Sequence, residues 1–142
     1  MPEEILRFTA EHLDACAHLF ISVFNRERWQ LETARMRLSE MLNTPDFVGF
    51  VLFRQELLGF VVGCSEQLEN GKHFKLKEIC VRTDSHGLLI ATKLLHHLES
   101  TLAMMNVKLI YLQTMESGHI HAVLDDNWLP KEFANNFELT PM

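Results

Sequence analysis

Short runs of apolar residues, several rich in β-branched and aromatic side chains, predict the strands of this protein. Strands of this kind are typically bounded by Gly, Pro, Asn, Asp or Ser. The runs that meet this description are Ile5–Phe8, Phe47–Phe53, Leu57–Gln67, His73–Val81, Val107–Thr114 and Asn136–Leu139. Phe47–Phe53 and Leu57–Gln67 are almost continuously apolar, so we expect both faces of their sheet to be covered.

Apolar residues three or four positions apart predict the helices. Thr9 can cap a first helix, which is followed by a second helix over Leu31–Leu42. A third, longer helix begins at Leu88, and Asn106 is a suitable stop. Its apolar face consists of Ala91, Leu94, Leu95, Leu98, Leu102 and Met105. Residues 117–127 resemble a short helix.

The stretch from His73 to Met105 reads as a strand, a polar loop and a helix. The loop, Arg82–Gly87, contains Asp, Ser and Gly, which favour turns. The first amides of a helix lack internal partners and the helix dipole adds positive charge there, so this loop predicts an anion site for a phosphate-bearing ligand. Neither the Walker motif nor the G-x-G-x-x-G dinucleotide motif is present.

Length and charge narrow the classes of partner. The 142 residues contain no repeats and no linker, so we expect one domain over residues 1–142. The formal net charge of −6 argues against bulk attraction to nucleic acid or to an anionic membrane. Arg82, Lys93 and Lys108 are either local cations for an anionic ligand or ordinary surface charges.

Cys16, Cys64 and Cys80 form no C-x-x-C pair and lie among apolar residues, which predicts buried, reduced thiols. The chain starts with acidic residues and has no run of roughly 18 apolar residues. These features predict a protein of the cytoplasm. The histidines form no recognisable ligand set with Cys or carboxylates, so no metal is expected.

The order of these elements resembles that of the GCN5-related N-acetyltransferase (GNAT) superfamily. The sequence segments on which this resemblance rests are Phe47–Val51, Leu58–Gly63, Leu76–Val81 and Leu94–Glu99. The family's acyl-coenzyme A loop, Gln/Arg-x-x-Gly-x-Gly/Ala, aligns with His86–Ala91, where Ala91 conforms but His86 and Leu89 depart. The resemblance implies an α+β fold: a mixed, mostly antiparallel, twisted sheet of about six to seven strands flanked by helices.

The resemblance also implies where acetyl-CoA binds as a co-substrate. Backbone groups of the central strand would hold the pantetheine arm as an added strand, and helix amides would hold the pyrophosphate. The residues concerned are Ile79, Cys80, Val81, His86, Gly87, Leu88, Leu89, Ile90, Ala91 and Thr92. Leu89 stands where the family has a glycine that lets the backbone approach the ligand closely, so we expect weaker binding of acetyl-CoA. Leu124 stands where the family has a Tyr that protonates the departing thiolate, and Trp128-Leu129 stands where it has Gly-Phe.

Strict alternation along His73–Val81 would place Phe74, Leu76, Glu78 and Cys80 on one face. A carboxylate on an apolar face loses hydration, which would raise its pKa toward neutrality and suit a general base. Many family members place a glutamate near Glu78 for this purpose. The alternative is a structural ion pair with a lysine on a neighbouring strand.

Two further residues are candidates for the acceptor site. Glu66, on the preceding strand, is a second candidate base that could flank the same pocket as Glu78. In this superfamily the first two helices and their link border the acceptor site. Trp29, in that link, therefore either lines a pocket or packs in the core.

Two functions remain open on these residues. The first is an acyl-CoA-dependent N-acyltransferase, in which a primary amine of a small molecule or peptide attacks the thioester of acetyl-CoA directly. Cys80 as a covalent nucleophile has no partner His placed by the sequence. The second is a catalytically impaired module of the same fold for acyl-CoA sensing or protein association. The sequence leaves the acceptor unidentified and a homodimer open.

Overall fold

The computed structural model describes residues 2–24, 29–82, 87–113 and 120–124. Within these residues three α-helices and one short 3-10 helix accompany a six-stranded sheet. The strands are β1 (Glu4–Arg7), β2 (Phe47–Arg54), β3 (Glu56–Leu68), β4 (Gly71–Val81), β5 (Val107–Gln113) and β6 (Ile120–Leu124). The helices are η1 (Ala10–His12), α1 (Leu13–Val23), α2 (Leu31–Leu42) and α3 (Gly87–Met104).

The strands lie in the sheet in their sequence order, from β1 to β6. Every neighbouring pair is antiparallel except β4 and β5, which run parallel. Parallel neighbours need a crossover, and α3 supplies it between β4 and β5. The mixed, mostly antiparallel sheet expected from the sequence is therefore confirmed.

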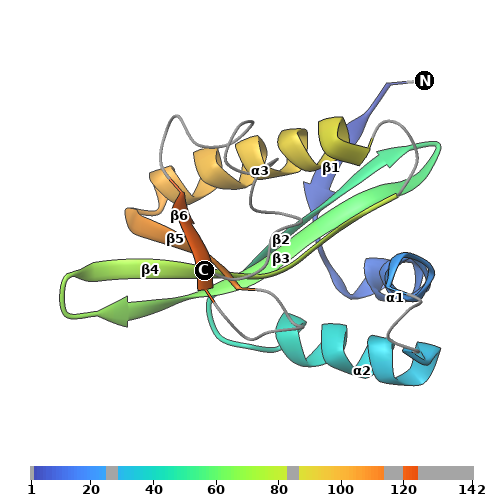
Figure 1. Cartoon of the computed structure of the whole chain (residues 1–142), viewed down its shortest axis with the longest axis horizontal. Coiled ribbons are helices and arrows are strands. Elements are labelled where there is room, and N and C mark those ends of the chain that lie inside the picture. Colours follow the sequence, from blue (N-terminus) through green and yellow to red (C-terminus); the bar gives the residue numbers. More distant parts are fainter. Residues whose placement is uncertain (1, 25–28, 83–86, 114–119, 125–142) are drawn as a thin grey trace.

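Helices cover both faces of the sheet (Figure 1). α3 packs on one face, where its buried residues join Phe74, Leu76 and other strand residues in one core. α1 and α2 pack on the opposite face, in a second core that includes Phe20, Leu38 and Phe60. The nearly continuous apolar runs of β2 and β3 follow from this two-sided burial.

Most element boundaries agree with the apolar spacing. α2 has the bounds that its periodicity predicts, and Asn106, just after α3, adopts the left-handed backbone conformation with φ 62° that ends many helices. The helix expected over residues 117–127 is wrong, because Ile120–Leu124 forms β6 and pairs antiparallel with β5. The β-branched residues Ile120 and Val123 suit a strand that completes the sheet edge. The strand expected over Asn136–Leu139 lies outside the described residues.

A β-bulge in β4 overturns the expectation that Phe74, Leu76, Glu78 and Cys80 share a face. Val62 pairs with Glu78 and Gly63 pairs with Leu76, so Lys77 is an extra residue opposite β3. One extra residue inverts the alternation of every side chain beyond it.

The two cores show the result of this inversion. Phe74 and Leu76 lie in the core beneath α3, whereas Cys80 lies in the core beneath α1 and α2. Glu78 contacts α2 and therefore lies on the same side as Cys80.

Gly63 permits the close approach of β3 and β4 at this bulge. A Cβ atom at position 63 would lie 2.2 Å from the backbone oxygen of Lys75 and 2.6 Å from the ring of Phe74. Both distances are far below van der Waals contact, so only glycine fits without a shift of the backbone. No helix among the described residues is long and apolar enough to cross a membrane.

Candidate active site

The carboxyl-terminal half of β4 presents backbone groups that β3 does not use. The backbone N–H of Arg82 donates to the backbone oxygen of Leu58 at 3.0 Å, and the same antiparallel register continues through Gly59↔Val81 and Val61↔Ile79. Because successive residues of a strand direct their peptide groups to opposite sides, those of Ile79 and Val81 point away from β3.

On that other side, the described part of β5 pairs with only part of β4. The pairing runs from Lys72↔Val107 to Leu76↔Leu112, and the described part of β5 ends one residue later at Gln113, whereas β4 continues to Val81. Among the described residues, no strand therefore pairs with Ile79 and Val81 on this side, and their N–H and C=O groups are suited to an added strand.

α3 begins beside the end of β4. A Cβ atom on Gly87 would lie 2.6 Å from the backbone oxygen of Arg82, so the helix start and the strand end touch. Ile90 and Ala91 are buried against the sheet, whereas the side chains of Leu88 and Leu89 are about half exposed, at 54% and 50%. The side chain of Leu89 therefore points outward, into the solvent.

Thr92 and His86, the other candidate cofactor-binding residues near the start of α3, provide no described side-chain group for binding an anion. The hydroxyl of Thr92 donates to the backbone oxygen of Leu88 at 2.8 Å, which is a bond within the helix. His86 lies outside the described residues. The groups in this part of the chain that could bind a phosphate are the first backbone amides of α3, a helix of 18 residues.

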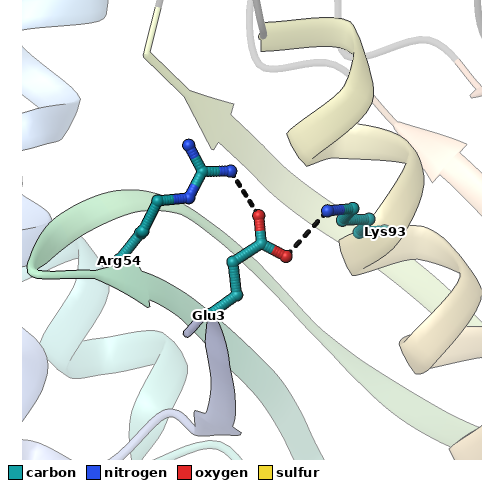
Figure 2. Close-up of polar contacts among 3 residues, drawn as sticks. All are labelled: Glu3, Arg54 and Lys93. Atoms are coloured by element: carbon teal, nitrogen blue, oxygen red, sulfur yellow. Dashed lines mark hydrogen bonds and ion pairs between the residues drawn. The ribbon is translucent and has the colours of Figure 1, made fainter. Parts of the chain in front are cut away.

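Two of the three candidate cations are engaged in ion pairs with carboxylates. Arg82 pairs with Glu56 at 2.9 Å. Lys93 donates to Glu3 Oε1 at 2.7 Å, and Arg54 pairs with Glu3 Oε2 (Figure 2).

Glu3 thereby joins the amino-terminal segment to the end of β2 and to α3. The hydrogen bond from Lys93, followed by that from Arg54, lowers the pKa of Glu3. These contacts favour the interpretation of Arg82 and Lys93 as structural surface charges. The side chain of Lys108 lies outside the described residues.

Glu78 forms a buried ion pair with Arg37 of α2. The Nη2 and Nε atoms of Arg37 donate to Glu78 Oε2 at 2.9 Å and 3.3 Å. The Glu78 side chain is only 5% exposed and that of Arg37 is 29% exposed. A guanidinium in this position favours the ionised carboxylate and offsets the cost of burying it. The described partner is thus an arginine from a helix.

A cavity of about 190 Å³ lies between α2 and the β4 bulge. Its lining comes from α2, from the turn that follows it, from β3 and from the bulge. The lining residues are Arg37, Glu40, Met41, Thr44, Gly63, Cys64 and Lys77. Since Arg37 lines the cavity and contacts Glu78, a molecule in the cavity would lie next to the arginine that holds the candidate base.

The second candidate base, Glu66, does not lie in this cavity. Glu66 pairs across the hairpin with His73, five residues along β4 from Glu78, which separates the two by ~16 Å at the usual rise of a strand. Its side chain is 51% exposed and lies 3.5 Å from Lys75. The expectation that Glu66 flanks the same pocket as Glu78 is therefore wrong.

The cysteines and Trp29 have local roles. Burial, followed by the charge of Glu78, raises the pKa of Cys80, so this residue is a neutral thiol and a poor nucleophile. Cys16 is also buried, whereas Cys64 is only half-buried and lines the cavity, contrary to the expectation of a buried thiol.

The ring of Trp29 lies 5.1 Å from that of Phe20, edge to face, which favours packing in the core over a pocket-lining role.

Other sequence candidates fall partly outside the described residues. Leu124 is in β6, where it pairs with Ile110, but its side chain is not described; Trp128 and Leu129 are not described at all. Among the described residues, no three His, Cys, Asp or Glu side chains lie close enough together to hold a metal ion.

Sequence reasoning missed Arg37, Lys77 and Glu40 as site residues. Arg37 and Glu40 are polar residues on an amphipathic helix and have no local sign of a site. Lys77 shares this face with Glu78 only because the bulge turns Glu78 toward α2, and bulges have no dependable local signature beyond a nearby glycine such as Gly63.

Comparison with known proteins agrees with this fold. The model of the acetyltransferase (GNAT) family matches residues 10–123, so the chain belongs to this family. A crystal structure of aminoglycoside 6'-acetyltransferase type Ii is 23% identical, with a TM-score of 0.65, over 77% of this chain and 70% of that chain. A probable acetyltransferase is 24% identical, with a TM-score of 0.67, over 80% and 81% of the two chains.

A third structure is the ribosomal-protein-alanine N-acetyltransferase from Brucella melitensis biovar Abortus 2308. It is 16% identical, with a TM-score of 0.68, over 82% of this chain and 83% of that chain. At these identities the likeness concerns the fold. Comparison with curated protein sequences gave no match.

Proposed function

We propose that this protein is an acyl-CoA-dependent N-acyltransferase that transfers acetyl from acetyl-CoA to a primary amine of a small molecule or peptide in the cytoplasm. The observation that carries the proposal is the juxtaposition of two features. The backbone groups of Ile79 and Val81 that no described strand uses lie on the same strand segment as Glu78, and Glu78 is held by Arg37, which lines the cavity.

In the proposed arrangement, backbone groups of Ile79 and Val81 bind the pantetheine arm, with Cys80 between them. The pyrophosphate lies against the first amides of α3. The residues proposed there are His86, Gly87, Leu88, Leu89, Ile90, Ala91 and Thr92. The outward side chain of Leu89 leaves the amides accessible, which supports weak binding over none.

The proposed chemistry is a direct transfer. The amine nitrogen attacks the carbonyl carbon of the thioester, a C–N bond forms, and the C–S bond breaks as the sulfur leaves as a thiolate. A thiol's pKa of about 8.5 makes the thiolate a fair leaving group without a general acid. Glu78 accepts the proton that the amine loses, directly or through a water molecule, and no covalent enzyme intermediate is needed.

One observation favours the alternative of an impaired module for acyl-CoA sensing or protein association. The Arg37–Glu78 pair stabilises a carboxylate that a general base must instead use to take a proton. Two assays separate the functions: the melting temperature with and without acetyl-CoA, and the release of coenzyme A thiol when amines are added. Acetyl-CoA binding with thiol release supports the enzyme, whereas binding without release for any amine supports the module.

A further inference from the structure

The cavity between α2 and the β4 bulge carries two opposite charges that are not paired with each other or with other described residues. Lys77 on the bulge and Glu40 on α2 both line it, and neither lies within ion-pairing distance of an opposite charge in the part of the chain that the structure describes. The hydroxyl of Thr44, also in the lining, is used locally, because it donates to the backbone oxygen of Glu40 at 2.8 Å.

The position of Lys77 relative to the candidate base follows from the bulge. Lys77 and Glu78 are consecutive, yet one lines the cavity beneath α2 and the other contacts Arg37 of α2, so both side chains project toward the same helix. Glu40 lies one helical turn after Arg37 and on the same side of α2. The cavity is thus bordered by the guanidinium of Arg37, which holds the candidate base, by the ammonium of Lys77 and by the carboxylate of Glu40.

We propose that this cavity takes a small zwitterionic amine, with Lys77 binding its carboxylate and Glu40 attracting its ammonium. The proposal rests on the proposed function and names the class of its acceptor. A cavity of about 190 Å³ is below the ~300–1,000 Å³ that hold drug-sized ligands, so the acceptor is of amino-acid size.

Polycations are disfavoured in the same site. An amine with several positive charges would meet Lys77 and Arg37, and like charges placed together in an interface cost affinity. Aminoglycosides and polyamines are therefore expected to be poor acceptors, although aminoglycoside acetyltransferases share the fold.

The test compares small L-amino acids with their matching carboxamides, with spermidine and with an aminoglycoside. Binding is measured by calorimetry in the presence of coenzyme A, and acetylation is measured by thiol release from acetyl-CoA. We expect the carboxylate form to bind about tenfold or more tightly than the carboxamide, as is usual for a hydrogen bond to a charged group.

Two variants locate this preference. Lys77→Met keeps the length of the side chain but removes its charge, and should abolish the preference for the carboxylate without lowering the melting temperature. Lys72→Met, on the same strand but outside the cavity, should leave the preference intact.

Equal or tighter binding of carboxamides or spermidine would overturn the inference, as would an unchanged preference in Lys77→Met or no binding by any of the amines. Thiol release with polyamines in preference to amino acids would overturn the inference but support the proposed function. Selective binding of amino acids without any thiol release would overturn the proposed function but support the ligand class.

Discussion

Arg37 and Glu78, which lie 41 positions apart in the sequence, form an ion pair that joins α2 to the bulged part of β4. The distance from Arg37 Nη2 to Glu78 Oε2 is 2.9 Å, and the carboxylate is almost completely buried. This contact links the candidate base to Arg37, which lines the cavity.

The first prediction concerns the stability that this pair provides. Arg37→Met should lower the free energy of unfolding by about 1–3 kcal/mol near neutral pH, because it removes a charged hydrogen-bond donor from a buried carboxylate. Urea denaturation measures the loss.

The control for this variant is Arg35→Met on the same helix. Arg35 pairs with Asp14, and their side chains are 39% and 64% exposed, so its loss should cost well below 1 kcal/mol. Equal losses for the two variants would contradict the structural role assigned to the buried pair.

The second prediction concerns the start of α3. Leu89→Gly should tighten acetyl-CoA binding if the helix amides hold the pyrophosphate, because it restores the glycine of the family motif. Leu88→Gly is the matched control, since Leu88 is equally exposed and lies in the same turn. Both variants should lose about 1 kcal/mol of stability from glycine in a helix.

Thermal melts at several acetyl-CoA concentrations measure this effect. At about 100 times the dissociation constant, the ligand should stabilise the fold by roughly 2.7 kcal/mol. If Leu89→Gly and Leu88→Gly respond identically to the ligand, Leu89 is not part of the binding loop.

The third prediction concerns the bulge. Gly63→Ala should destabilise the protein by about 1–3 kcal/mol, since its Cβ atom would collide with the backbone oxygen of Lys75. Ser65→Ala on the same strand is the control. Its buried hydroxyl has no hydrogen-bond partner among the described residues, so its removal should cost little. A Gly63→Ala variant as stable as Ser65→Ala would argue against the close approach of β3 and β4.

The fourth prediction uses the lowered pKa of Glu3. A carboxyl group with a lower pKa in the folded state stabilises that state above the ordinary value of 4.5, and this contribution is lost as the pH falls through the lower folded value. Glu3→Gln should therefore be less stable than the unmodified protein at neutral pH, and the difference should disappear in acid. Glu4→Gln, which removes an exposed glutamate, should show neither effect. A difference that persisted unchanged into acid would contradict the ion pairs of Glu3 with Lys93 and Arg54.

Apolar spacing predicts most of the fold because the same spacing controls burial. The apolar positions of α2 and α3 are three or four residues apart, and the residues that the structure buries against the sheet are among them. Met105, which was expected on the apolar face of α3, is instead exposed just beyond the end of this helix. The parallel arrangement of β4 and β5 follows from the length of the crossover helix between them. Residues 117–127 misled the prediction because a short apolar run fits a helix or a strand equally well.

The site was less predictable, because it depends on one inserted residue and on a contact that is distant in the sequence. Strict alternation put Glu78 beneath α3, whereas the bulge at Lys77 turns it toward α2. Arg37 had no local sign of this role. The pairing geometry of Ile79 and Val81 followed from the resemblance, but their binding of acetyl-CoA stays a prediction.

The most direct test of the account is turnover by the unmodified protein and by Glu78→Gln across a pH series, with an amine that the unmodified protein acetylates. If Glu78 is the base, Glu78→Gln should bind acetyl-CoA almost unchanged but lose about 10²–10⁴ in rate near neutral pH. The loss should shrink at alkaline pH, where free amine is abundant. Equal rates for the two proteins at every pH would contradict the assignment of Glu78 as the general base.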